Sequence, residues 1–326
     1  MTDDPGPTKP PHRGRGASRA EFRAQVQSTK ADIERQVQAT KAQLDATNER
    51  IEARTGRNLI LATLIGLVLG GSMLVSLIFI KELFMIVAFV IVGFTSFELA
   101  QALRHGGRNV PRIPVLISAV AVVPAAFYGD AAGQWLATLG GIAFIALWRV
   151  AMLVLPAHRA PAKIVLGDIG GGFLIQVYVV FLASFAVLLV TQEGGQWWTL
   201  AFLLLVISAD TAAYAAGLSF GKHRMVPTIS PKKTWEGFAG AAIVCMVVGI
   251  LLAIFMLDEP WWFGPIFGTV ILITATFGDL AESLIKRDLG IKDMSSWLPG
   301  HGGFLDRLDS ILPSAAAAYA LYLIFA

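Results

Sequence analysis

Long runs of apolar residues recur from residue 58 to the end of this chain and limit its fold more than any other feature. Several runs hold roughly 20 apolar residues, the length that an α-helix needs to cross a bilayer. The runs are continuous rather than alternating, which favours helices over the strands of a β-barrel. Charged residues make up only 15% of the chain, against about 25% in a typical soluble domain. We therefore predict an all-α, polytopic integral membrane bundle.

The apolar runs predict nine transmembrane helices within residues 58–326, which we expect to form one membrane-embedded domain. The predicted helices cover residues 59–80, 83–103, 113–128, 133–154, 172–191, 197–218, 237–257, 262–280 and 309–326. The third is short and contains Pro124, which blurs its ends.

Residues 1–57 form a polar tail whose composition differs from that of the rest of the chain. Its first part, MTDDPGPTKPPHRGRGAS, is rich in Pro, Gly and Arg, so we expect disorder there. Between residues 19 and 57, apolar residues recur near heptad spacing, which predicts a helix. That helix could form a short coiled coil or lie on the membrane surface. A solvated helix without a specific partner is an equally good alternative.

Lysine and arginine gather in the tail and in the even-numbered loops between the predicted spans, while the odd-numbered loops hold almost none. Positively charged loops stay on the cytoplasmic side of a membrane. We therefore expect the N-terminus and the long sixth and eighth loops to face the cytoplasm, in the cell (plasma or inner) membrane. Nine spans would then place the C-terminus outside.

A first polar cluster begins inside the sixth predicted span, in SADTAAYAAGLSFGKHRMVPTISPKKTWEG. Asp210 lies within the apolar run, and a carboxylate at that depth indicates a functional site by default. The loop then supplies Ser230, Lys232, Lys233 and Thr234, whose ammonium and hydroxyl groups suit a polyphosphate. A loop that is merely positive on the cytoplasmic side is the alternative for the lysines.

A second polar cluster, GDLAESLIKRD, closes the eighth predicted span. Asp279, Glu282, Ser283 and Lys286 follow at helical spacing and share one helix face. A stripe of salt bridges is the alternative.

A third cluster, PGHGGFLDRLD, precedes the last span and places Asp306 and Asp309 one helical turn apart. A helix N-terminus favours carboxylates by about 0.3–1 kcal/mol, but this does not explain the HGG sequence, or Asp279 and Asp293 in the same layer. Clustered carboxylates repel one another unless they are protonated or bridged by a cation. Mg²⁺ binds through one or two carboxylates and substrate phosphates. The acids therefore predict a metal site for phosphate chemistry.

The segment SLIKRDLGIKDMSSWLPGHGGFLDRLD resembles the signature of the phosphatidate cytidylyltransferases, the CDP-diacylglycerol synthases. The fixed positions of that signature are occupied by Ser283, Lys286, Arg287, Lys292, Asp293, Pro299, His301, Gly302, Gly303, Asp306, Arg307 and Asp309. The upstream SPKKTWEG is similar to a second element of the family. The resemblance covers residues 59–326 and does not reach the tail.

This resemblance implies an enzyme of phospholipid biosynthesis that transfers CMP from CTP to phosphatidate, giving CDP-diacylglycerol and pyrophosphate. The attacking phosphate is already anionic, so the enzyme must mainly position two anions and stabilise charge on pyrophosphate. The expected catalytic residues are Asp279, Asp306, Asp309 and Lys286. The same three acids are the expected ligands of Mg²⁺, with Asp210 and Asp293 as further candidates. One or two divalent ions, with or without a monovalent cation, are compatible with the resemblance.

The expected partners are CTP, phosphatidate and the lipid bilayer, with no nucleic acid, and a homodimer is left open. The residues expected to bind substrates are Ser230, Lys232, Lys233, Thr234, Arg287, Lys292, His301, Gly302, Gly303 and Arg307. For His301, a structural role is an equal alternative.

Two other classes of function are alternatives to this one. A transporter or channel would spread its acids through the membrane depth and show internal repeats, whereas these acids gather at one face. A lipid or polyprenol kinase that uses CTP would lack the match to HGG and the following acids. Labelled CTP and phosphatidate distinguish the three, because only the first activity yields lipid-linked CMP.

The tail shares no composition with the catalytic clusters, so we predict that residues 1–57 are dispensable for chemistry. A truncated protein that starts near Arg57 should keep its turnover in detergent. Complete loss of activity in a well-folded truncation would show that the tail belongs to the site.

Overall fold

The computed structural model describes residues 30, 59–295, 297 and 302–326, and the chain divides into the units Met1–Ile60 and Leu61–Ala326. The predicted tail lies outside the described residues except for Lys30, which is helical and exposed. Its disorder and its helix therefore stay predictions.

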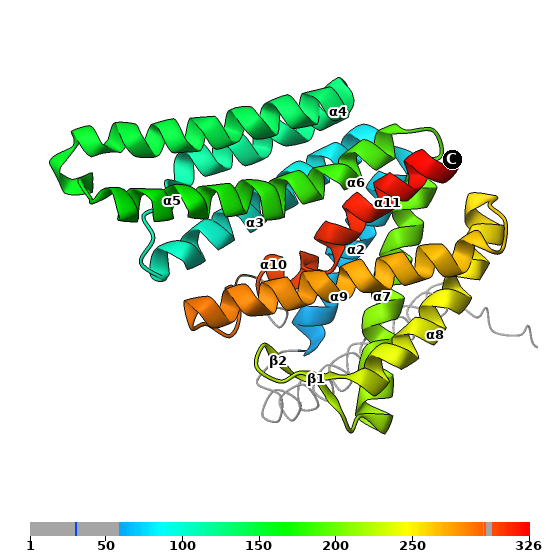
Figure 1. Cartoon of the computed structure of the whole chain (residues 1–326). Helices are drawn as coiled ribbons and strands as arrows, with labels where there is room; N and C mark the ends of the chain where they lie inside the picture. Colours follow the sequence, from blue (N-terminus) through cyan, green and yellow to red (C-terminus); the bar gives the residue numbers. More distant parts are fainter. Residues whose placement is uncertain (1–29, 31–58, 296, 298–301) are drawn as a thin grey trace, which may run out of the picture. The chain divides into compact units, whose positions relative to one another are not determined.

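Helices account for almost all of the second unit (Figure 1). The α-helices are α2 (Leu59–Phe79), α3 (Lys81–His105), α4 (Arg112–Ala151), α5 (Ala162–Leu174), α6 (Leu182–Thr191), α7 (Gly195–Phe220), α8 (Trp235–Leu252), α9 (Phe263–Leu289), α10 (Leu305–Leu308) and α11 (Ile311–Phe325). Short 3₁₀ turns occupy Met152–Val154 and Pro156–His158, and π-helical turns occupy η3 (Ile175–Phe181) and η4 (Ala253–Leu257). The strands β1 (Arg224–Val226) and β2 (Ser230–Thr234) form an antiparallel hairpin.

Seven helical segments of the described chain are long and apolar enough to cross a membrane. They are Lys81–His105, Arg112–Val154, Ala162–Thr191, Gly195–Phe220, Trp235–Leu257, Phe263–Leu289 and Leu305–Phe325. The prediction of an all-α, polytopic membrane bundle is therefore confirmed. Nine as the number of spans stays a prediction.

Helix α4 is a hairpin of two arms rather than one straight rod (Figure 1). Asp130 interrupts it with φ 51° and ψ −156°. Past this reversal the arms are so close that a Cβ on Gly133 would lie 2.2 Å from the carbonyl oxygen of Ala125. The two arms correspond to the third and fourth predicted spans.

One helix boundary predicted from the apolar runs was wrong, because α5 begins at Ala162 rather than at residue 172. The helices of the last two predicted spans continue into the neighbouring polar clusters, as the helical spacing of their acids predicted: α9 ends at Leu289, and the last helical segment begins at Leu305. The added turns carry acids that the fold pairs: Asp168 with Arg149, and Glu282 and Asp306 with Lys286. Pairing offsets part of the cost of placing such charges in a helix of a membrane bundle.

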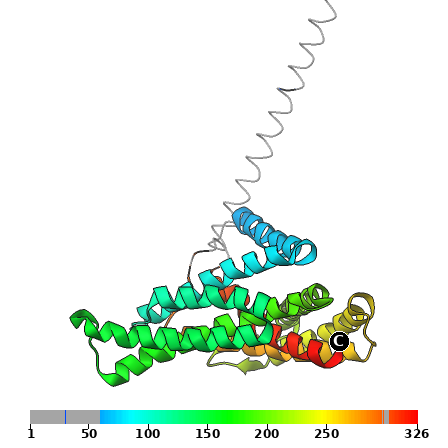
Figure 2. The same cartoon turned by 90° about the horizontal axis from the view of Figure 1, so that it is seen from above.

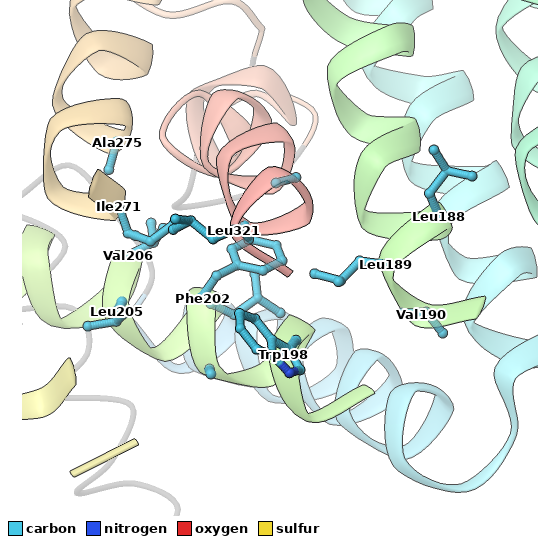
Figure 3. Packing of buried hydrophobic residues seen from close by; sticks show 14 of the residues in the cluster. Leu188, Leu189, Val190, Trp198, Phe202, Leu205, Val206, Ile271, Ala275 and Leu321 are labelled. Carbon is cyan, nitrogen blue, oxygen red and sulfur yellow. The ribbon is translucent and has the colours of Figure 1, made fainter. Parts of the chain in front are cut away.

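The main hydrophobic core lies where α6, α7, α9 and α11 meet (Figure 3). Trp198 and Phe202 of α7 lie at its centre. The Trp198 ring centroid is 5.4 Å from those of Phe263 on α9 and Tyr322 on α11. Figure 2 shows α11 beside α9 and α6, as the contacts between these helices require.

The backbones of α8 and α9 are in direct contact. A Cβ on Gly268 of α9 would lie 2.2 Å from the carbonyl oxygen of Cys245 on α8. A glycine is therefore required at this contact, which holds the first half of α9 in place.

A buried ion pair joins α4 to α5. Asp168 accepts hydrogen bonds from Nε of Arg149 at 2.9 Å and from the backbone N–H of Asn109 at 2.6 Å, and both charged side chains are 1% exposed. The pair thereby also fixes the loop between α3 and α4.

We predict that Asp168→Asn lowers the stability of the bundle, because it leaves the buried guanidinium of Arg149 without a counter-charge. Breaking one partner of a buried pair costs roughly 3–5 kcal/mol. Thermal unfolding in detergent measures the loss, and Asp130→Asn in the turn of α4 is the matched control. An Asp168→Asn protein as stable as that control would contradict the structural role.

Candidate active site

A basic pocket of about 500 Å³ lies between the β1–β2 hairpin and the end of α9. Its size is within the range of ligand pockets, about 300–1,000 Å³. Its lining includes Ser230, Lys232, Ser283, Lys286, Arg287 and Lys292. The fold therefore brings four of the residues predicted to bind substrates together with the predicted catalytic residue Lys286, from two separate segments of the chain, and adds Ser283.

Two contacts hold the hairpin against α9. Arg287 donates from Nε to the carbonyl oxygen of Ile229 at 3.3 Å, and Lys233 pairs with Asp279 at 2.7 Å. Thr234 ends the hairpin and caps α8, because its side chain accepts the N–H of Gly237 at 3.1 Å. Lys233 therefore points toward the acids, while its neighbour Lys232 lines the pocket.

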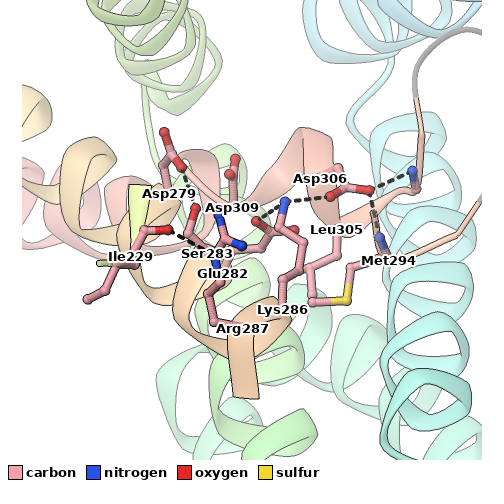
Figure 4. Close-up of polar contacts among 12 residues, drawn as sticks. Ile229, Asp279, Glu282, Ser283, Lys286, Arg287, Met294, Leu305, Asp306 and Asp309 are labelled. Atoms are coloured by element: carbon pink, nitrogen blue, oxygen red, sulfur yellow. Dashed lines mark hydrogen bonds and ion pairs between the residues drawn. The ribbon is translucent and has the colours of Figure 1, made fainter. Parts of the chain in front are cut away.

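Three of the predicted acids share one neighbourhood. Asp279 comes from α9, Asp309 from the junction of α10 and α11, and Asp210 from α7. Asp279 and Asp210 lie close enough to Asp309 for their charges to repel it. Figure 4 shows Asp279 and Asp309 as neighbours beside Ser283, which donates to Asp279 at 3.3 Å. Lys233 is the cation paired with this group.

Asp306 belongs to a different group, on the other side of Lys286 (Figure 4). Its carboxylate accepts hydrogen bonds from Nζ of Lys286 at 2.9 Å and from the backbone N–H groups of Met294 at 3.1 Å and Gly303 at 2.8 Å. Lys286 also pairs with Glu282 at 2.5 Å. Asp306 therefore ties both ends of the loop before α10 to α9.

Glu98, from the middle of α3, is a site residue that the sequence analysis missed. Its carboxylate is 1% exposed and accepts hydrogen bonds from the backbone N–H groups of Phe304 at 3.1 Å and Leu305 at 2.8 Å, and from Oγ of Ser295. A Cβ on Gly303 would lie 2.4 Å from Oε1 of Glu98, so a larger residue there would displace this carboxylate. The signal was a carboxylate within an apolar run.

The remaining predicted residues lie around these groups. Gly302 has φ 86°, a backbone conformation that favours glycine. Arg307 is exposed on α10, and Asp293 is exposed before Met294. Among the described contacts, none joins Asp293 to the other predicted acids. His301 lies outside the described residues.

The acids around Asp309 form a donor set that suits a hard divalent cation. Within the described part of the chain, no three His, Cys, Asp or Glu side chains form a ready metal cluster. Mg²⁺ needs only one or two carboxylates, with the rest of its shell from water and phosphates. Asp279 and Asp309, with Asp210 beside them, therefore fit such an ion.

Comparisons with known proteins show a family that this chain matches over most of its length. Residues 60–325 match the model of the "Cytidylyltransferase family". A protein of Mycobacterium tuberculosis (strain ATCC 25618 / H37Rv) named phosphatidate cytidylyltransferase is 40% identical over 273 residues, 82% of this chain and 83% of the relative. Proteins of the same name from Mycobacterium bovis and Mycobacterium leprae are 40% and 36% identical, over 89% and 88% of their own lengths.

We predict that Glu98→Gln lowers the turnover number of the protein and leaves the KM values nearly unchanged, because the amide no longer accepts all three hydrogen bonds. A hydrogen bond to a charged group contributes about 1.5–3 kcal/mol, which corresponds to a loss of roughly 10- to 100-fold. The exposed Glu82→Gln in the first turn of the same helix is the control. Unchanged turnover would contradict the positioning role, and lower stability with normal turnover would leave Glu98 a purely structural residue.

Proposed function

This chain belongs to the cytidylyltransferase family, and from that premise we propose that it joins CTP and phosphatidate into CDP-diacylglycerol and pyrophosphate. The observation that carries the proposal is the basic pocket beside the clustered acids, at the polar ends of apolar helices. The names of the mycobacterial relatives support the choice of phosphatidate. A transporter loses support, because the chain belongs to a family of transferases.

We assign the triphosphate of CTP to the basic pocket. Lys232, Arg287 and Lys292 line it with positive charge, and Ser230 adds a hydroxyl donor. Cations placed where charge develops stabilise a transition state because they need no reorganisation during the reaction. The hairpin brings Lys232 to the pocket, and α9 brings Arg287.

The acids next to this pocket would hold Mg²⁺. Asp279 and Asp309 are the ligands that the geometry favours, with Asp210 close to both. Asp306 and Asp293 stay predicted ligands, although the contacts of Asp306 with Lys286 and two backbone N–H groups also suit an organising role. The ion would supply positive charge to the departing pyrophosphate.

The residues of the chain mainly position and neutralise the two reactants. A phosphate oxygen of phosphatidate attacks the α-phosphorus of CTP, and the bond from that phosphorus to the pyrophosphate oxygen breaks. The attacking oxygen is already anionic, so no general base has to remove a proton. Lys286, held between Glu282 and Asp306, places an ammonium group between the pocket and the acids.

We also propose that this face of the bundle is cytoplasmic. The hairpin and the segment between α9 and α10 correspond to the sixth and eighth loops, which carry most of the lysine and arginine of the membrane domain. CTP would then enter from the cytoplasm, while phosphatidate would arrive from the bilayer.

The activity is tested with purified protein, labelled CTP, phosphatidate and Mg²⁺. Lipid-linked CMP is the expected product. Lipid-linked phosphate would instead indicate a kinase, and no labelled lipid would contradict the proposal.

We predict that Asp279→Asn, Asp306→Asn and Asp309→Asn each abolish this activity while the protein still inserts and purifies normally. The first and third variants should also weaken the dependence on Mg²⁺, because they remove charge from the proposed metal site. Asp258→Asn, in the exposed turn before α9, is the matched control. A variant within about tenfold of the parent, roughly 1.4 kcal/mol of barrier, would rule out that residue as an essential ligand.

A further inference from the structure

An apolar groove of about 580 Å³ runs along α3 and the first arm of α4. Phe89, Val90, Gly93, Phe94, Phe97, Leu116, Ile117, Val120 and Trp297 line it. Several of these side chains are exposed: Phe89 is 41% exposed, Val90 45% and Ile117 50%. The groove is therefore an apolar channel on the surface of the bundle.

One end of the groove is built by the segment that carries the site residues. Phe94 stacks on Phe304 with ring centroids 5.3 Å apart, and Phe97 stacks on Trp297 at 5.8 Å. Phe304 precedes Asp306 by two residues and donates its N–H to Glu98. A molecule in the groove would therefore reach the loop that Asp306 and Glu98 hold.

A cation lies at the same end of the groove. Arg112, the first residue of α4, places its guanidinium carbon 5.7 Å from the centre of the Phe97 ring. Among the described residues, none accepts a hydrogen bond from its buried Nε. Nε itself is covered, but the residue is half-buried, so an anionic group at this end of the groove would meet the terminal nitrogens of the guanidinium.

The length of the groove fits one layer of a bilayer. From Phe97 to Phe89, α3 advances about 12 Å, close to half of a hydrocarbon core about 30 Å thick. A lipid tail that starts at the level of the site would lie along the groove within its own leaflet.

We propose that the groove and Arg112 together bind the lipid substrate, with one acyl chain in the groove and the phosphate headgroup beside the guanidinium. This inference rests on the proposed function and names the part of the site that selects the lipid. The apolar lining recognises the tail, and Arg112 recognises the anionic phosphate because guanidinium groups bind phosphate oxygens in pairs.

Filling the groove tests the place of the tail. Val90→Trp should raise KM for dipalmitoyl phosphatidate by about tenfold, because a long chain loses several buried methylenes, and should change KM for dioctanoyl phosphatidate by less than about twofold. KM for CTP should stay unchanged. Val247→Trp on α8 is the matched control, since Val247 is 53% exposed and lies outside the groove lining. Equal effects of the two substitutions, or equal effects on the two lipids, would overturn the assignment of the tail.

Removing the cation tests the place of the headgroup. Arg112→Gln should raise KM for both phosphatidates by about tenfold, because a charge-assisted hydrogen bond is lost. Arg159→Gln, in the exposed segment before α5, is the control and should leave both values unchanged. A change in KM for CTP instead of phosphatidate would assign Arg112 to the nucleotide and overturn this part of the proposal.

A binding test separates this inference from the proposed function. A phosphatidate with a photoreactive diazirine on its acyl chain should label peptides of α3 and α4 in the full-length protein. Unlabelled phosphatidate should compete with it, and phosphatidylcholine should not. This result would support the groove even in a protein that forms no CDP-lipid. Uniform labelling of all helices, or equal competition by both lipids, would overturn it. Disulfide cross-linking of Val90→Cys between two chains would show that a second copy covers the groove, and would overturn it as well.

Discussion

Lys286 lies between Glu282 and Asp306, and its ammonium group keeps two carboxylates together where their repulsion would otherwise separate them. The rest of the site follows from this contact. Asp306, once fixed, accepts the N–H groups of Met294 and Gly303, so one carboxylate holds residues on both sides of the segment before α10. Glu98 then binds the start of α10 from a position more than two hundred residues earlier in the sequence. A single cation on α9 thus determines where the last helix begins.

The acids of the site form two groups, one around Asp306 and one around Asp309, and the two groups differ in how their charge is balanced. The group around Asp306 is satisfied by Lys286 and by backbone donors, so its charge is used within the protein. The group around Asp309 brings Asp279 and Asp309 together, with Asp210 near them and Lys233 as the paired cation. Mg²⁺ takes only one or two carboxylates from a protein, so such a pair suits it. Aspartate therefore has a structural role on one side of Lys286, at Asp306, and suits metal binding on the other side, at Asp279 and Asp309.

Helical spacing made part of the site predictable. Asp279, Ser283 and Lys286 could be placed on one face of a helix, because residues three and four apart meet there. The hairpin that brings Lys232 to α9 could not be predicted, since its strands are too short for an alternating pattern. Glu98 depends on contacts between distant segments, which no spacing reveals, although the rule that singled out Asp210 also applies to it. The start of α5 was misplaced because polar residues such as Asp168 were read as loop, before their partners were known.

Helix α9 is one unbroken rod from the tight glycine contact with α8 to the basic pocket. Gly268 lies against the backbone of α8, and Lys286 follows eighteen residues later on the same helix. The two positions are therefore about 27 Å apart along the axis. In a rigid helix of that length, a tilt of about 5° at Gly268 moves the end that carries Lys286 by roughly 2 Å. A methyl group at the glycine contact that tilted the helix by this angle would displace Lys286 by most of a hydrogen-bond length, although the glycine lies far from the basic pocket.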